Sequence, residues 1–164
     1  MSALRSASSS DREIVLRHAA LQPVRLGALA EELGLEVRLA TLKPGISGEI
    51  KKSETAPSGY LIRINRHEKR ERQRFTLAHE ITHYLLHREK IGNGLSDDIL
   101  YRSRLSDTLE AEANRGAAEI LMPRGKLLER WQEFGNARDE ETIAALAAEF
   151  QVSKQALSIR LGIK

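Results

Sequence analysis

His79-Glu80-Ile81-Thr82-His83 is the stretch that decides how this sequence is interpreted. Four residues of α-helix turn by about 400°, so His79 and His83 lie one turn apart on nearly the same face and can both direct a ring nitrogen at one ion. Glu80 lies about 100° further round the helix, where its carboxylate can reach a water molecule on that ion. Two imidazoles and a carboxylate at this spacing indicate a metal-dependent hydrolase.

The residues around this motif favour a formed helix. Neither Pro nor Gly occurs between Arg66 and Lys90, and apolar residues recur at helical spacings: Phe75, Leu77, Ala78, Ile81, Leu85 and Leu86. Histidines on an otherwise apolar face cost stability unless their nitrogens are satisfied, and a bound cation satisfies them. The competing interpretation is a helix whose histidines face solvent or fill satisfied core positions. His87, one turn further on, is expected to be an outer-shell or surface group.

A catalytic zinc ion usually has three protein ligands and one position for water, so one more donor is expected. The chain contains no cysteine, which excludes thiolate sites. The pattern H-E-x-x-H-x-x-G-x-x-H also fails, because Leu86 stands in place of the glycine and Glu89 in place of the third histidine. A carboxylate further along the chain is therefore the remaining candidate.

Residues 107–122 are predicted to form a helix that carries three such carboxylates, Glu110, Glu112 and Glu119. Glu112 lies close to the edge of the apolar stripe of this helix, where a carboxylate needs a partner. Glu110 and Glu119 can more easily be solvated helix charges. Spacing alone does not separate Glu112 from Glu110.

Two blocks of sequence together resemble the ImmA/IrrE family of metallo-endopeptidases: RQRFTLAHEITHYLLH at residues 72–87 and EAEANRGAAEILMP at residues 110–123. The resemblance extends from about Ile14 to the C-terminus. It implies a zincin-like fold of the gluzincin type with Zn²⁺ as cofactor. It also implies that Glu112, the Glu before Ala-Asn, is the third ligand beside His79 and His83, and that Glu80 is the general base.

The resemblance also implies a substrate class, namely a partner helix-turn-helix transcriptional repressor that is cut at a limited site. The sequence departs from the family at two positions. Thr82 stands where the family often has Gly, and Gly116 stands where it often has a bulky apolar residue. Neither position is one of the expected ligands, so the departures concern local packing.

The expected fold class is α+β, with three parts along the chain. Residues 1–10 contain five serines and are expected to be a disordered tail. Residues 11–123 are expected to form the metallopeptidase domain, with a small antiparallel sheet packed on helices, and residues 124–164 a C-terminal helical, helix-turn-helix-like segment. Strands are expected at 35–40, 46–50 and 60–65. In zincins an edge strand binds the substrate backbone, and the strand at 60–65 is expected near that edge.

The C-terminal helices, at 140–149 and from Ser153 to about Leu161, allow a competing function. In that alternative the chain is a DNA-binding or antitoxin-like regulator whose metal site senses rather than catalyses. A helical lid on the catalytic domain is favoured over DNA contact. The second helix exposes few side chains suited to base readout: Lys154, Gln155, Ser158 and Arg160.

Composition places further bounds on the protein. A length of 164 residues suits one domain with a core and at most a small appendage. The absence of cysteine excludes a disulfide framework, and no segment approaches the roughly 18 consecutive apolar residues of a membrane span, so a cytoplasmic location is expected. The net charge is only +3, and the basic run at 63–74 is broken by acidic residues, as on a solvated helix face.

Tyr84, His87 and Tyr101 are weak candidates for stabilising an oxyanion.

Overall fold

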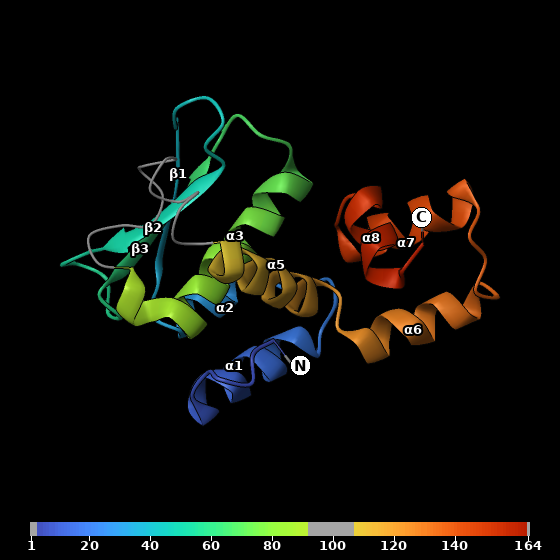
Figure 1. Cartoon of the computed structure of the whole chain (residues 1–164), viewed down its shortest axis with the longest axis horizontal. Coiled ribbons are helices and arrows are strands. Elements are labelled where there is room, and N and C mark those ends of the chain that lie inside the picture. Colours follow the sequence, from blue (N-terminus) through green and yellow to red (C-terminus); the bar gives the residue numbers. More distant parts are fainter. Residues whose placement is uncertain (1–2, 92–106, 164) are drawn as a thin grey trace.

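The chain has an α+β fold in the computed structural model, which describes residues 3–91 and 107–163 (Figure 1). The elements in chain order are α1 (Ser9–Ala19), α2 (Leu26–Glu32), β1 (Glu36–Ala40), β2 (Gly48–Lys52), β3 (Tyr60–Asn65), α3 (Arg70–His87), the 3₁₀ turn η1 (Arg88–Lys90), α5 (Asp107–Leu121), α6 (Arg124–Glu133), α7 (Glu140–Phe150) and α8 (Lys154–Leu161). Tyr101, one of the candidates for oxyanion stabilisation, lies outside the described residues. Among the described helices, none combines the length and the apolar character that crossing a bilayer requires.

The three strands form a mixed sheet in the order β1-β3-β2. β3 pairs in parallel with β1 and antiparallel with β2, so the expectation of an antiparallel sheet is corrected. The expectation that residues 60–65 lie near the edge is also wrong, because β3 is the central strand. Its residues Leu61, Ile62 and Ile64 are all buried, as in a strand covered on both faces, whereas the middle of β1 is exposed. β2 and β1 are therefore the edges.

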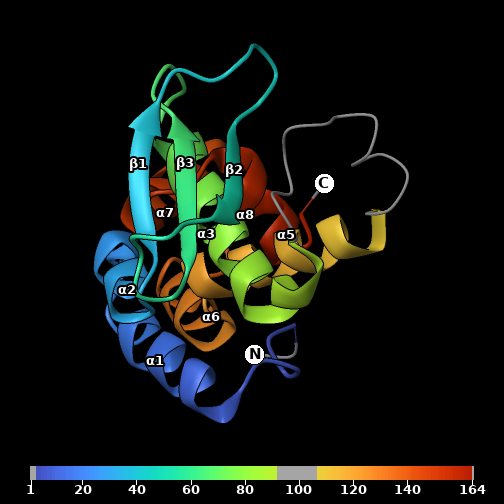
Figure 2. The same ribbon diagram turned by 90° about the vertical axis from the view of Figure 1, so that its left-hand side faces the viewer.

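Helix α3 lies at the centre of the molecule. It packs against β2 and β3 on one side and against α5 on another. Figure 1 shows α3 and α5 between the sheet and the C-terminal helices, and Figure 2 shows the three strands side by side in front of α3. Because α3 is enclosed, its polar residues Glu80, Thr82 and His83 are at most 1% exposed. A helix so deeply buried must satisfy these groups within the protein.

The structure differs from the expected disordered tail at residues 3–8. Leu4 is 1% exposed and Ala7 is 6% exposed, and both belong to the hydrophobic core. Ser8 caps α1, since its hydroxyl accepts a hydrogen bond from the Asp11 backbone at 3.2 Å. One of the serines in this segment thus serves as a helix cap, and the two apolar side chains anchor the segment in the core.

The predicted C-terminal helix pair is present as α7 and α8. Gln151 ends α7 in the left-handed conformation with φ 55°, and the Ser153 hydroxyl caps α8 by accepting from the Ala156 backbone at 3.0 Å. The buried residues Leu146 and Leu157 belong to the same core as the sheet residue Ile62. The C-terminal helices are therefore packed onto the rest of the protein.

The two departures from the resembled family lie against each other in the interface between α3 and α5. Thr82 is fully buried, and its hydroxyl donates to the Ala78 carbonyl at 2.8 Å. A Cβ atom on Gly116 would lie 2.4 Å from Thr82 Cγ2 and 2.9 Å from its Oγ1. The threonine on α3 thus occupies the space that the glycine on α5 leaves, and the two residues set how closely the helices approach.

We expect Gly116→Ala to destabilise the protein by about 1–3 kcal/mol, because the new methyl group would overlap Thr82. Urea unfolding at equilibrium measures this change. Thr82→Ala removes both clashing atoms, so the double variant should recover most of the loss. Gly125→Ala is the matched control, since its Cβ would meet nothing within 4 Å in helix α6, and it should stabilise by about 0.4–1 kcal/mol. Additive effects of Gly116→Ala and Thr82→Ala would contradict the contact.

Candidate metal centre

Two histidines of α3 and one carboxylate of α5 converge in a single cluster. His79 Nε2 lies 2.8 Å from Glu110 Oε2, and His83 Nε2 lies 3.2 Å from Glu110 Oε1. The two imidazole rings are 4.7 Å apart and nearly perpendicular, at 87°. One candidate ligand atom from each of the three residues lies within 4.8 Å of the other two. The predicted pair of histidines on one helix face is therefore present, and it faces Glu110.

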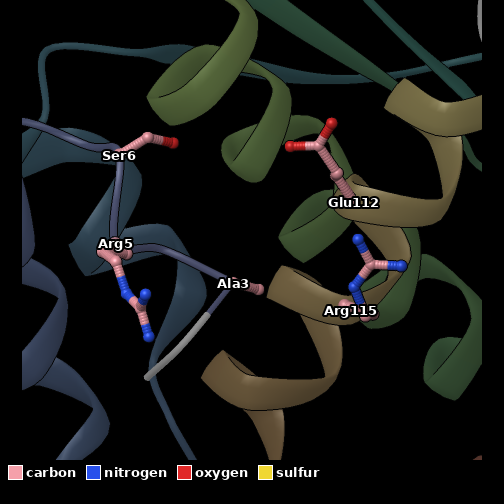
Figure 3. Close-up of a pocket in the computed structure, with 5 residues that line it drawn as sticks. All are labelled: Ala3, Arg5, Ser6, Glu112 and Arg115. Atoms are coloured by element: carbon pink, nitrogen blue, oxygen red, sulfur yellow. The ribbon is translucent and has the colours of Figure 1, made fainter.

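The placement expected for Glu112 is corrected: the carboxylate that faces the two histidines is that of Glu110. Residues two apart on a helix point about 200° apart, so the two carboxylates cannot face the same site. Glu112 instead has its Oε2 3.6 Å from His87 Nε2. Glu112 also lines a small pocket with Arg115 of α5 and with three residues near the N-terminus, as Figure 3 shows: Ala3, Arg5 and Ser6.

The sequence contains a signal for Glu110 as well. Glu110 and Asn114 are one helical turn apart, so they form a polar row on one face of α5. The apolar stripe of this helix instead favours Glu112, the carboxylate that lies closest to it. The structure instead directs the row of Glu110 and Asn114 at the histidines of α3.

The second ring nitrogen of each histidine is held by another side chain. His79 Nδ1 donates to the Asn114 amide oxygen at 2.8 Å. His83 Nδ1 lies 2.9 Å from His87 Nδ1. Such bonds orient an imidazole and leave its Nε2 directed at the shared position. His87 is thus buried against His83 rather than at the surface, and Asn114 is a partner of His79 that the sequence does not indicate.

Glu80 lies beside the cluster with one oxygen that lacks a partner. The residue is 1% exposed, and its Oε1 makes no hydrogen bond to any described residue. An unsatisfied buried carboxylate oxygen is costly, and a water molecule held between Glu80 and the cluster would donate the missing bond. Two imidazole nitrogens, one carboxylate and this adjacent acceptor fit a divalent cation that keeps one position for water.

The charges of the cluster favour the same arrangement. Burial lowers the pKa of His79, but the hydrogen bond to Glu110 and the charges of Glu80 and Glu110 outweigh it and leave that pKa above its ordinary value. Burial raises the pKa of Glu110, but the hydrogen bonds from His79 and His83 outweigh it and leave that pKa well below its ordinary value. Without a metal, a proton on His79 Nε2 offsets the Glu110 charge, and a divalent cation can replace that proton.

The cluster opens into a cleft of about 1030 Å³. Its walls come from the edge of the sheet at β2, from α3 and α5, and from the C-terminal helix α8. His79, Glu80 and Glu110 are among the lining residues. A space of this size is large enough for a drug-sized molecule or a short segment of a peptide.

Two of the candidates for oxyanion stabilisation, Tyr84 and His87, do not line this cleft. The Tyr84 ring packs against Tyr60 at 5.6 Å and beneath the guanidinium of Arg88 at 3.8 Å. His87 is engaged with His83, and Tyr101 lies outside the described residues. The side chain that would assist the oxyanion is therefore not identified among the described candidates.

Comparisons with known proteins identify the family of the chain. The model of a family described as the IrrE N-terminal-like domain, a peptidase family, matches residues 30–162. Two relatives are named radiation response metalloprotease IrrE. The protein of Deinococcus radiodurans is 40% identical over 101 residues, which are 59% of this chain and 29% of the relative. That of Deinococcus deserti is 42% identical over 83 residues, which are 48% and 28%.

The chain therefore aligns with less than a third of the length of either relative. Among solved structures, a protein described as a Mycobacterium tuberculosis transcriptional regulator matches with a TM-score of 0.60 at 16% identity. That match covers 93% of this chain and 46% of the other, and it shows a shared fold.

We expect Glu110→Gln to weaken Zn²⁺ binding by at least about 100-fold, because it removes the carboxylate that faces both histidines. Glu112→Gln is the matched control on the same helix and should weaken binding by less than about tenfold, since Glu112 faces His87 rather than the two histidines of the cluster. Competition titration with a zinc-sensitive dye measures both affinities. The reverse order of the two losses would restore Glu112 as the ligand.

The metal-free protein should lose stability above pH 6.5. The pKa of His79 is higher in the folded protein than in the unfolded chain, where it is about 6.5. This difference stabilises the folded state below pH 6.5, and the stabilisation is lost as the pH rises through the pKa of the folded state. The lowered pKa of Glu110 adds stability above its unfolded value of about 4.3, and that stability is lost as the pH falls. Urea unfolding in EDTA should therefore show a larger advantage of pH 5.5 over pH 8.5 in the wild type than in Glu110→Gln. Equal pH dependence in both proteins would contradict the pairing.

Proposed function

This chain belongs to the ImmA/IrrE family of metallopeptidases, and we propose that it is a zinc-dependent endopeptidase whose ligands are His79, His83 and Glu110. One observation carries the proposal: these residues form a compact cluster next to the unpaired, buried oxygen of Glu80. A zincin-like fold of the gluzincin type is part of the same proposal.

The reaction is the addition of water to a peptide carbonyl, followed by cleavage of the C–N bond. Zinc, when bound, would polarise the scissile carbonyl and lower the pKa of a water molecule. The Glu80 carboxylate accepts a proton from that water while the oxygen of the water bonds to the carbonyl carbon. Glu80 then delivers the proton to the leaving nitrogen, which departs as an amine. Asn114 and His87 keep the imidazoles of His79 and His83 in place throughout.

The edge strand β2 is suited to hold the substrate backbone. Gly48, which begins β2, lies so close to α3 that a Cβ atom there would be 2.5 Å from Thr76 Cγ2. Thr76 is one turn before Glu80, so this edge runs beside the catalytic base. Ser47 and Gly48 both line the cleft. An extended peptide can pair with β2 on the side away from β3 and pass across the cluster.

The proposal extends to the substrate, a partner helix-turn-helix transcriptional repressor in the cytoplasm, which the family resemblance supports. The DNA-binding alternative has less support. Lys154 pairs with Glu140 at 2.6 Å, and the Arg160 Nε donates to the Met122 carbonyl at 3.1 Å. Gln155 faces the cleft. Three of the four side chains suited to base readout are therefore engaged within the protein or directed at the cleft.

We expect Glu80→Gln to slow cleavage by about 10²- to 10⁴-fold while zinc content stays the same, because Glu80 moves a proton and is not a ligand. The test is co-expression with the repressor encoded nearest to the gene, followed by intact-mass measurement of the fragments and metal analysis of the purified enzyme. Glu71→Gln is the control, since Glu71 lines the mouth of the same cleft but is exposed. Undiminished cleavage by Glu80→Gln would overturn the role of the base. Wild-type protein that binds zinc but leaves the repressor intact would overturn this choice of substrate.

A further inference from the structure

Ile159 on α8 has an exposed side chain that the fold does not explain. It is 71% exposed, whereas Leu157 on the same helix is fully buried. Single exposed apolar residues are common on protein surfaces and need no explanation. Ile159, however, lines the cleft that contains the metal centre. An apolar side chain in that position faces whatever enters the cleft.

Two rows of side chains, one on α3 and one on α5, lie side by side and lead from the metal centre toward α8. On α3 the row continues from His79 back by one turn to Phe75, and on α5 it continues from Asn114 forward by one turn to Ala118. The helices run antiparallel here, because Glu110 meets both histidines while Asn114 meets only His79. The next pair along the rows is therefore Phe75 and Ala118, and both line the cleft.

Helix α8 closes the far end of these rows. Ile159 and Ala156, three residues apart on α8, line the cleft together with Met122 at the end of α5. Hydrogen bonds fix this wall. The Arg160 Nε donates to the Met122 carbonyl at 3.1 Å, and the Arg74 Nε donates to the Gln151 carbonyl at 3.3 Å. We call the resulting patch the apolar subsite; it consists of Phe75, Ala118, Met122, Ala156 and Ile159.

We infer that the apolar subsite binds an apolar side chain of the peptide substrate, and that Ile159 determines this preference. The inference rests on the proposed function and deepens it. The occupant is a substrate side chain rather than a separate partner, because the patch is continuous with the metal centre along both helices. Among the charged residues of the cleft outside the metal centre, Arg115 and Glu119 lie on α5 beside the rows, and Arg160 of α8 donates to the Met122 carbonyl. The others lie beyond Phe75, toward the start of α3: Lys69, Glu71 and Arg72. The patch itself therefore favours an uncharged group. The helix that resembles a DNA-reading element is thus a wall of the substrate site.

Two hydroxamates test the inference on the zinc-loaded protein by isothermal titration calorimetry. Acetohydroxamic acid can bind only the metal, whereas N-acetyl-leucine hydroxamate adds a backbone and an isobutyl group that can reach the apolar subsite. We expect the leucine probe to bind at least about tenfold more tightly to the wild type, from burial of its side chain. Ile159→Asp should remove most of that advantage and leave acetohydroxamic acid binding unchanged, and Ile159→Leu should keep it.

Leu21→Asp is the matched control, because Leu21 is 77% exposed and does not line the cleft, and it should behave as the wild type. If acetohydroxamic acid binds but the leucine probe gains nothing, or if Ile159→Asp keeps the full gain, the subsite is overturned and the proposed metal centre stands. If neither hydroxamate binds the wild type, the metal centre of the proposed function is overturned, and the subsite with it.

Discussion

The close packing of α3 against α5 is the contact on which the site depends. α3 carries two histidines one turn apart, and α5 carries the carboxylate that meets them. The separation of the helices decides whether these groups can share an ion. Gly116 and Thr82 set that separation, since a larger residue at 116 would overlap the threonine. Because protein interiors are closely packed, a displacement at this contact would also move neighbouring groups. The packing of Gly116 against Thr82 therefore controls the geometry of the cluster, although neither residue belongs to it.

The same interface contains an unusual amount of buried polarity. Glu80 and His83 are each 1% exposed, and His87 is 5% exposed. Most of this polarity is satisfied in pairs: Asn114 holds His79, and His87 holds His83. Two atoms are exceptions: Glu80 Oε1 and His87 Nε2 make no hydrogen bond to the described residues, although Glu112 Oε2 lies 3.6 Å from the latter. Unsatisfied buried groups in natural proteins concentrate where a ligand or water completes them, which is why the Glu80 carboxylate is the candidate base of the proposed reaction.

The cleft is assembled from segments far apart in the sequence. The start of β2 supplies one edge, α3 and α5 supply the floor with the candidate metal centre, and α8 supplies the opposite wall. The C-terminal helices share the hydrophobic core with the sheet, so this wall is part of the folded unit. Backbone binding and side-chain selection can therefore come from different ends of the chain.

The sequence by itself determined the groups whose meaning is local. His79, Glu80 and His83 could be placed from helical periodicity, and the ends of α7 and α8 from the capping residue Ser153 and the turn before it. The sequence could not decide between Glu110 and Glu112, because both suit the same helix. Only the rotation of α5 against α3 shows which of the two faces the histidines. The central position of β3 and the placement of α8 on the cleft depend likewise on long-range packing. Local periodicity specifies which face a residue occupies on its own element, but the partner of that face is decided by the tertiary structure.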